Sequence, residues 1–384
     1  MRQALYHARV LTPTGFVDNR VLLLHGRHIL DLVTPDDRRL QGAERIDCGG
    51  DLLLPGFIDV QVNGGGGVLF NDQPSAEGIR QIAAAHRRFG TTGLLPTLIT
   101  DDRIQIERAV SAVRDAIDAN VPGVLGVHIE GPCLNEVRAG AHDASKFRDL
   151  DEDDIRTLCA LRNGRTLVTL APEMTKLATI SRLADAGVRI SAGHTNARYD
   201  DIAAALKYGL TGFTHLFNAM SGLTSREPGV VGAALIDADS WCGIIVDGHH
   251  VDPVVLKLAL SCKPKKRFML VTDGMPCVGT EAQEFMLQGR RIHVEGGRCV
   301  DDDGVISGSS LDMASALRNA VRWLGLSMAE AAYMASTGPA EFLGIAHEYG
   351  KIAAGYRANL VRLGDCFKVR GTWIDGQWQS AEPV

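Results

Sequence analysis

Acidic and imidazole side chains stand near the ends of several apolar segments in the middle of this chain. The run GVHIEGP carries His128 and Glu130, which share one face of a strand because side chains alternate with a period of two. The segments RISAGHT and TGFTHLFNAM carry His194 and His215, and RFMLVTDGM carries Asp273. A carboxylate is costly to bury unless it is paired or holds a metal. This series of strand ends therefore predicts a hydrolytic metal site.

The residue types in this series suit one kind of chemistry. Glu130, His194 and His215 supply one carboxylate and two imidazoles, a ligand set that suits zinc with one position open for water. Bound zinc lowers the pKa of that water from 15.7 to about 7. Asp273 is the candidate base that takes the proton of the water and returns it to a leaving amine. An amide is the expected target, because its leaving group is poor unless it is protonated.

An alternation of apolar strands with amphipathic helices must position these residues. Segments such as SAEGIRQIAAAHRRFG end at glycine, a common helix stop, and two further helices are expected at 311–324 and 327–335. Eight strands with intervening helices predict a closed (β/α)8 barrel of the TIM type, with its active site at the C-terminal ends of the strands. The eight candidate strands lie at residues 51–62, 93–99, 123–129, 166–172, 188–192, 212–215, 241–246 and 267–272.

Both ends of the chain break this rhythm with short strands separated by turns. We therefore expect an α/β fold in which residues 1–52 and 349–384 form one small, discontinuous β-sandwich domain. Residues 53–348 would then form the barrel. The segment at about 285–307 has β-type alternation between the turns QGRR, EGGR and DDDG, which predicts a β-hairpin inserted after the eighth strand.

Composition narrows the class of protein. The 384 residues are 45% hydrophobic and 22% charged, which excludes disordered and fibrous classes. The formal net charge of −6 gives no reason to expect nucleic acid or a membrane as partner. The apolar pattern predicts neither a signal peptide nor a membrane span. The eight cysteines form no C-x-x-C pair, which favours free thiols in a reducing cytoplasm.

Eight short motifs follow one another in order: DVQVN, HIEGP, SAGHT, THLFNAM, REPG, VDGHHVD, TDG and SGSSL. Over nearly the whole chain this series resembles the N-acetylglucosamine-6-phosphate deacetylases of the amidohydrolase superfamily, and HIEGP and HLFNAM with REPG are its most specific parts. The resemblance implies hydrolysis of the N-acetyl group of N-acetylglucosamine 6-phosphate, in amino-sugar catabolism or cell-wall recycling. It places Glu130, His194 and His215 on the metal ligands and Asp273 on the catalytic acid/base.

The resemblance also implies which residues hold the substrate. His142, in the AGAHD turn, falls on a histidine that binds and polarises the substrate carbonyl. Arg226 falls on an arginine that crosses a dimer interface in the family, so a homodimer is expected, with a tetramer left open. Adjacent strand residues face opposite ways, so only one of His249 and His250 is expected to meet the substrate, and the resemblance favours His250. The implied substrate contacts are Ala141, His142, Asn218, Ala219, Arg226, His250, Ser307, Gly308 and Ser309.

One motif departs from the wider superfamily. Many amidohydrolases carry His-x-His at the end of the first strand, where this chain has Gln61 and Asn63 around a valine. Neutral amides are poor zinc ligands beside imidazole, thiolate and carboxylate groups. We therefore expect one divalent metal per chain, most simply Zn²⁺, with iron or cobalt as alternatives for the same site.

Two other functions stay open at this point. One is a sister activity on N-acetylgalactosamine 6-phosphate or another N-acyl amino sugar, because a single loop contact could decide between epimers. The other is a non-catalytic amidohydrolase-like scaffold, against which the complete set of Glu130, His194, His215 and Asp273 argues. Two features are expected to be structural. His128 should support the site rather than bind metal, and the NGGGGV run lacks the Lys-Ser/Thr of a P-loop.

Overall fold

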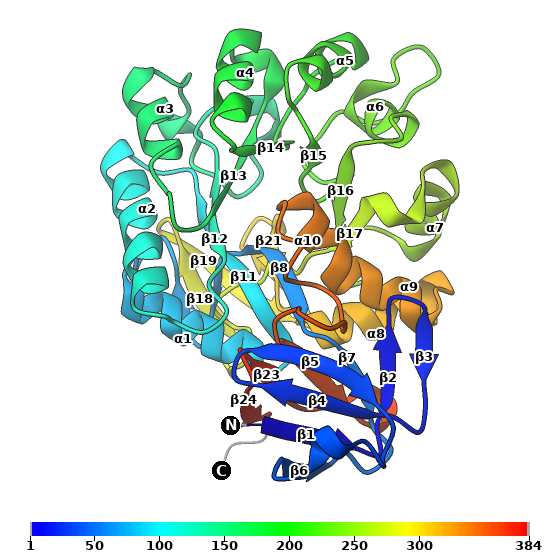
Figure 1. The fold of residues 1–384 in the computed structure, drawn as a ribbon. Coiled ribbons are helices and arrows are strands. Elements are labelled where there is room, and N and C mark those ends of the chain that lie inside the picture. Colours follow the sequence, from blue (N-terminus) through cyan, green and yellow to red (C-terminus); the bar gives the residue numbers. More distant parts are fainter. Residues whose placement is uncertain (1, 382–384) are drawn as a thin grey trace.

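A computed structural model describes residues 2–381 of the chain. Figure 1 shows helices α1 to α7 around a central barrel, with a smaller group of strands below it. The barrel sheet has the strand order β17-β16-β15-β14-β13-β12-β11-β8, and every pair of neighbours is parallel. This confirms the predicted (β/α)8 fold. Its strands are β8 (Phe57–Val62), β11 (Thr91–Ile99), β12 (Gly126–Glu130), β13 (Arg165–Leu170), β14 (Arg189–Ala192), β15 (Gly212–Phe213), β16 (Trp241–Ile244) and β17 (Phe268–Leu270).

The barrel closes where its first and last strands meet. Val62, at the end of β8, pairs in parallel with Gly274, and the amide of Asp273 donates to the carbonyl of Gln61 over 3.0 Å. Nearer the middle of the seam, the hydroxyl of Thr272 lies 2.5 Å from Oδ2 of the buried Asp59. The residues that follow β17 are therefore held in place by β8.

Eight helices cover the outside of the barrel and turn their apolar faces to the strands. They are α1 (Ala76–Arg87), α2 (Arg103–Asp118), α3 (Glu152–Leu158), α4 (Leu177–Asp185), α5 (Tyr199–Lys207), α6 (Gly229–Ile236), α7 (Pro253–Cys262) and α8 (Met313–Leu324). Ser327 caps α9 (Met328–Ala332) through a capping box with Glu330. A π-helical turn (Tyr333–Thr337) then leads into α10 (Gly338–Phe342), so this last helical segment runs further than residue 335.

Strands from both ends of the chain form a small β domain, as expected. A four-stranded sheet, β5-β4-β1-β6, lies beside a six-stranded sheet, β24-β23-β22-β7-β2-β3, in which β7 from the N-terminal part pairs with β22 from the C-terminal part. The first sheet contains β1 (Arg2–Tyr6), β4 (Val21–His25), β5 (His28–Val33) and β6 (Glu44–Asp47). The second contains β2 (Arg9–Thr12), β3 (Gly15–Val17), β7 (Leu52–Pro55), β22 (Leu360–Leu363), β23 (Val369–Ile374) and β24 (Gln377–Ser380).

The predicted first barrel strand, residues 51–62, is in fact two strands that belong to different sheets. β7 lies in the β domain and β8 in the barrel, and the chain passes between them at Gly56. A Cβ atom at Gly56 would lie 2.1 Å from Oγ1 of Thr92, so only glycine allows this close approach. The outermost residues of the predicted β domain, 1 and 382–384, lie outside the described part of the chain.

The predicted hairpin is a four-stranded antiparallel sheet. Its strands are β18 (Glu284–Leu287), β19 (Arg290–Glu295), β20 (Arg298–Asp301) and β21 (Ile306–Ser309), so it starts slightly earlier and ends later than 285–307. Ser309 pairs with Gly274, which joins this inserted sheet to the rim of the barrel. Leu287, Ile292 and Cys299 pack with residues of the 275–277 segment beneath it. The inserted sheet therefore stands directly beside the segment that carries Asp273.

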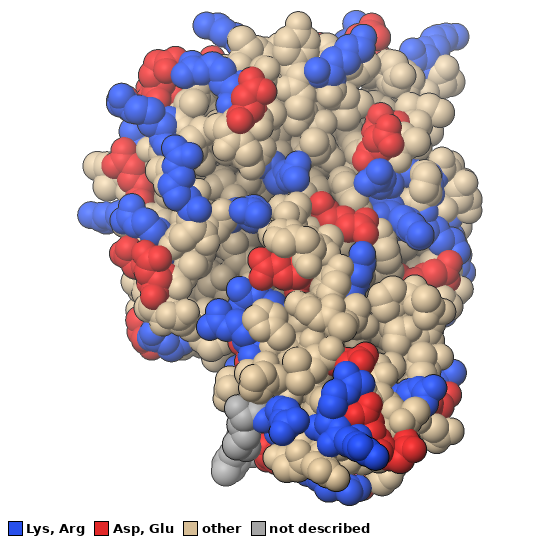
Figure 2. All heavy atoms as spheres, in the orientation of Figure 1, with Lys and Arg blue, Asp and Glu red and all other residues tan. Residues whose placement is uncertain are grey.

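The surface carries charges of both signs (Figure 2), and the cysteines of the described chain form no disulfide bonds. Over the face that Figure 2 shows, basic and acidic side chains alternate rather than gather into one large patch of either sign. No helix among residues 2–381 combines the length and apolar composition needed to cross a bilayer. All eight cysteines lie within this range and are free thiols.

Candidate active site

A cavity of about 330 Å³ opens at the C-terminal ends of the barrel strands. Most of the residues predicted for the site line it. Arg226 and Ser309 are the two predicted residues that do not. The lining residues include Glu130, Ala141, His142, His194, His215, Asn218, Ala219, His250, Asp273, Ser307 and Gly308.

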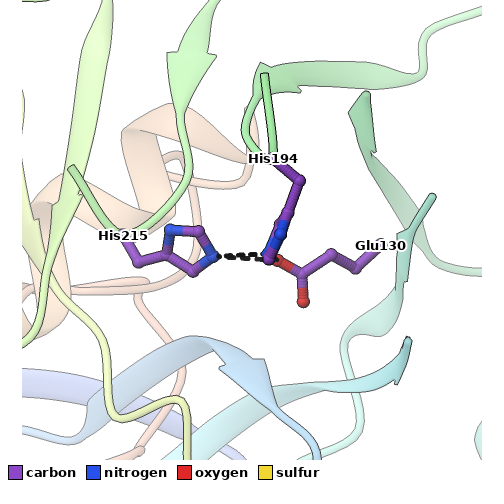
Figure 3. Close-up of side chains that lie close together, drawn as sticks. All are labelled: Glu130, His194 and His215. Carbon is purple, nitrogen blue, oxygen red and sulfur yellow. Dashed lines mark hydrogen bonds and ion pairs between the residues drawn. The ribbon is translucent and has the colours of Figure 1, made fainter. Parts of the chain in front are cut away.

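Glu130, His194 and His215, which all line this cavity, point toward one another (Figure 3). Nε2 of His215 lies 3.1 Å from Nε2 of His194 and 3.1 Å from Oε1 of Glu130. Nε2 of His194 lies 3.3 Å from the same carboxylate oxygen. The three side chains come from the ends of β12, β14 and β15 and are all buried. His194 and Glu130 stand 21 and 85 positions before His215 in the sequence, and the three meet at one point because the parallel strands of the barrel end at one rim.

The chemistry of this donor set fits a metal ion. Nδ1 of His194 lies 2.9 Å from the carbonyl oxygen of Arg138, which can only accept, so Nδ1 carries the hydrogen and Nε2 is left with a lone pair. Ligands of a tetrahedral ion with bonds of about 2.0–2.1 Å lie about 3.3 Å apart, close to the spacing observed here. Burial alone would raise the pKa of Glu130, but the neighbouring imidazoles of His194 and His215 hold that pKa well below its usual value. The carboxylate is therefore available as an anionic ligand.

Asp273 lies beside this cluster and is held by two amides. Nδ2 of Asn63 donates to Oδ1 of Asp273 over 2.6 Å, and Nε2 of Gln61 donates to the same oxygen over 3.2 Å. Nε2 of Gln61 also points to the carboxylate of Glu130, at 3.4 and 3.5 Å. Burial and the neighbouring charge of Glu130 raise the pKa of Asp273. The two amides thus turn their nitrogen atoms to carboxylates, an arrangement that the sequence motif alone did not reveal.

His142 presents one defined nitrogen to the cavity. The backbone N–H of Thr100 donates to Nδ1 of His142 over 3.3 Å, and the hydroxyl of Thr100 lies 2.9 Å from the same atom. Because a backbone N–H can only donate, Nδ1 is the acceptor and Nε2 carries the hydrogen. Burial and the nearby His194 hold the pKa of His142 well below its usual value, so the ring is neutral. The site therefore offers a neutral N–H donor next to the metal-ligating cluster.

Three catalytic candidates share an unusual backbone conformation. The φ angles are 48° at His194, 33° at His215 and 53° at Asp273, all in the left-handed region that residues with side chains seldom adopt. Such conformations persist only where the surrounding structure enforces them, and they gather at functional sites. The sequence carries no signal for this feature.

Three other residues predicted to contact the substrate, Asn218, Ser309 and Arg226, differ in position. The amide of Asn218 donates to the carbonyl of His215 over 3.0 Å, so it shapes the turn that holds this histidine. The hydroxyl of Ser309 donates to the carbonyl of Thr272 over 2.5 Å and is fully buried, so it fastens the inserted sheet rather than facing the cavity. Arg226 is exposed and lies outside the cavity.

Sequence reasoning missed an apolar wall and a cation of the cavity. Ile99, Leu287 and Ile306 line it from β11 and the inserted sheet, and Arg138 lines it from the loop after β12. None of these residues stands in a motif that marks chemistry. His128 lies outside the cavity, where it contacts the hydroxyls of Thr97 and Thr169, and burial lowers its pKa to about 4.

Comparisons with known proteins agree with this geometry. Residues 52–379 match the model of the Amidohydrolase family. The chain is 44% identical over 325 residues to the N-acetylgalactosamine-6-phosphate deacetylase of Shewanella sp. (strain ANA-3), which covers 85% of this chain and 82% of that protein. It is 35% identical to the N-acetylglucosamine-6-phosphate deacetylase of Haemophilus influenzae, over 99% of this chain and 100% of that one. The crystal structure of N-acetylglucosamine-6-phosphate deacetylase from Pasteurella multocida superposes with a TM-score of 0.95 at 33% identity, covering 99% and 100% of the two chains.

Proposed function

The chain belongs to the amidohydrolase family, and on this premise we propose that it hydrolyses the N-acetyl group of N-acetylglucosamine 6-phosphate to glucosamine 6-phosphate and acetate. The observation that carries the proposal is the cluster of Glu130, His194 and His215 beside Asp273 in one cavity. At about 330 Å³ the cavity has the size of a small-molecule site. Relatives that match over almost the whole chain bear the name of this activity.

We assign a separate role in amide hydrolysis to the metal ligands, to Asp273 and to His142. Glu130, His194 and His215 would hold a divalent ion, which would supply Lewis acidity for the activation of water at neutral pH. Asp273 takes the proton of the attacking water and delivers it to the nitrogen of the leaving amino sugar. Nε2–H of His142 donates to the carbonyl oxygen, where negative charge develops as the water adds. The raised pKa of Asp273 suits a group that must both accept and release this proton.

One metal per chain, most simply zinc, is part of the proposal. The ligand set of two imidazoles and one carboxylate suits zinc with an open position. Gln61 and Asn63 stand where a second site would need ligands, and both turn their NH₂ groups to carboxylates. An NH₂ group has no lone pair to offer a metal, which supports a single site.

The sugar phosphate would lie between this cluster and the mouth of the cavity. The cavity that would hold it is lined by Ala141, Asn218, Ala219, Ser307 and Gly308, among others. His250 would bind the phosphate together with Arg226 of a neighbouring subunit, since Arg226 lies outside the cavity of its own chain. Ser309 contributes by holding the inserted sheet in place.

A homodimer supplies that neighbouring subunit. Large apolar side chains are exposed on and just before α6 and on α7, of which Leu223 lies close to Arg226 in the sequence. They are Leu223 at 60%, Ile236 at 73%, Val254 at 69% and Leu258 at 62% exposure. The proposed subunit contact would cover side chains of this kind. The cytoplasm is the proposed location, because phosphorylated sugars are intracellular substrates and the eight cysteines are free thiols.

A second candidate substrate is N-acetylgalactosamine 6-phosphate. The relative from Shewanella, at 44% identity, is named for this epimer. The same metal cluster, base and phosphate contacts would serve either sugar, because the two differ only in the orientation of the hydroxyl at C4.

Acetate release by zinc-loaded protein tests the proposal. Three substrates are compared: the two N-acetylhexosamine 6-phosphates and unphosphorylated N-acetylglucosamine. We expect fast release that requires the phosphate, and the ratio of kcat/KM for the two epimers identifies the preferred one. Equal release with and without phosphate would reject the phosphate site, and no release from any of them would favour the scaffold alternative.

A further inference from the structure

A buried carboxylate stands behind His250, on the side of the ring away from the cavity. Oδ2 of Asp247 lies 2.6 Å from Nδ1 of His250, and the two side chains are only 5% and 7% exposed. Oδ1 of Asp247 accepts the backbone N–H groups of His249 over 2.8 Å and of His250 over 2.9 Å. One carboxylate thus binds both the ring and the main chain of the same histidine.

These contacts determine which nitrogen of His250 is available. Burial alone would raise the pKa of Asp247, but its hydrogen bonds with His250 hold that pKa below its usual value, so the group is a carboxylate. A carboxylate only accepts hydrogen bonds, so Nδ1 of His250 must carry a hydrogen. Nε2 is then the nitrogen left for the cavity, which His250 lines.

The segment around this pair is fixed at both ends. The amide of Asn319 in α8 donates to the carbonyl of Val246 over 2.8 Å, directly before Asp247. On the other side, Nε2 of His249 lies 3.1 Å from the carbonyl of Gly296, in the turn between β19 and β20. The pair therefore occupies a defined place between the barrel and the inserted sheet.

We propose that Asp247 is a positioning residue, which holds His250 with Nε2 toward the phosphate of the substrate and balances the charge of the imidazolium that binds it. A phosphate oxygen only accepts hydrogen bonds, so the binding form of His250 carries hydrogen on both ring nitrogens. Charge-assisted hydrogen bonds of this length are the strong ones in proteins. The inference rests on the proposed function, because it assigns a supporting residue to the phosphate contact of that site.

Steady-state kinetics of Asp247→Asn tests the proposal. Asparagine keeps the size of the side chain but cannot balance an imidazolium, so we expect KM for the phosphorylated substrate to rise about tenfold while kcat changes less than about twofold. The low residual activity expected on the unphosphorylated sugar should not change. Asp252→Asn is the matched control, because it removes a charge from the same loop but keeps an acceptor for Val254 N–H at the start of α7. It should leave both parameters unchanged.

A double-mutant cycle separates positioning from general damage to the fold. If Asp247 acts through His250, the variant Asp247→Asn/His250→Gln will have the same KM as His250→Gln alone. Additive effects of the two substitutions would overturn the proposal. So would an unchanged KM in Asp247→Asn when His250→Gln raises it.

NMR provides a readout that does not depend on turnover. Nδ1–H of His250 should give a strongly downfield proton resonance in the zinc-loaded enzyme, absent from His250→Gln and shifted upfield in Asp247→Asn. Addition of inorganic phosphate should shift the ¹⁵N resonance of Nε2 of His250 in the wild type. In Asp247→Asn, a higher phosphate concentration should be needed for the same shift. If the wild type releases no acetate but these shifts occur, the proposed function fails while the role of Asp247 stands. If the proton resonance does not depend on Asp247, the positioning role is wrong.

Discussion

Asn63 and Asp273 lie at opposite ends of the barrel sequence and are joined by a 2.6 Å hydrogen bond from Nδ2 to Oδ1. Asn63 follows the first barrel strand and Asp273 follows the last, so this bond crosses the seam where the barrel closes. Asp273 also has a left-handed backbone, and its amide is bonded to the carbonyl of Gln61. The candidate base is therefore placed by β8 as much as by its own strand.

The first prediction concerns Asp273 itself. Asp273→Asn should lower kcat by about 10²–10⁴-fold, the usual contribution of a general acid or base, because an amide cannot accept the proton of the attacking water. Metal content should not change, since the three proposed ligands remain. Acetate release and elemental analysis on the same sample check both points. A variant that keeps its activity would remove Asp273 from the mechanism.

The second prediction concerns the amide that orients this base. Asn63→Ala removes the 2.6 Å hydrogen bond, and we expect kcat to fall about tenfold with little change in KM. Asn163→Ala is the control, because this exposed amide binds Arg114 and Asp118 beyond the cavity lining. A rise in KM with an unchanged kcat would contradict the orienting role.

The third prediction concerns the metal. Elemental analysis should find one equivalent of tightly held divalent metal per chain, and removal by a chelator should abolish acetate release until zinc is added back. Glu130→Gln should lower metal affinity, because it replaces the anionic ligand by a neutral amide. Two equivalents of tightly bound zinc would refute the single-site proposal.

The fourth prediction tests whether Arg226 serves the neighbouring subunit. Arg226→Ala should raise KM strongly and lower kcat less. When this variant is unfolded and refolded together with Asp273→Asn, half of the dimers are mixed, and one site of each mixed dimer has both residues intact. The mixture should recover about a quarter of the wild-type sites. If Arg226 acts within its own chain, no intact site can form, and at low substrate concentration the mixture gains no activity beyond that of the two variants measured separately.

The fifth prediction concerns stability in the seam. Burial raises the pKa of Asp59 from 3.8 to about 7. The folded state therefore favours the protonated form, and the stability that this form contributes is present below pH 3.8 and is lost as the pH rises toward 7. Asp59→Asn cannot titrate, so its melting temperature relative to the wild type should increase between pH 5 and pH 8. A difference that does not vary with pH would show that Asp59 does not titrate in this range.

Local patterns predicted the barrel because each strand and helix has its own period and its own stop. The sequence also predicted that Glu130, His194 and His215 lie close together, because parallel strands of a barrel bring their ends to one rim. The break at Gly56 could not be predicted, because its cause is the side chain of Thr92, which lies on another strand. For a comparable reason the sequence did not predict that Ser309 holds the inserted sheet.

Interactions between distant segments also explain the other residues that the sequence did not reveal. Thr100 sets the tautomer of His142 from the end of β11, and Arg138 sets that of His194 through a carbonyl group. Neither role depends on a motif, because a backbone group of any residue can provide it. The resemblance implied that Arg226 crosses a dimer interface, and Arg226 lies outside the cavity of its own chain.

The seam between β8 and β17 holds the proposed base but not the proposed metal ligands. These ligands come from the ends of β12, β14 and β15, and neither strand of the seam is among them. Asp273 takes up its position only when the strand made last among the eight meets the strand made first. The position of the proposed base thus depends on closure of the barrel, whereas the three proposed metal ligands do not stand at the seam. We therefore expect opening of the seam to displace Asp273 before it disturbs the ligand cluster.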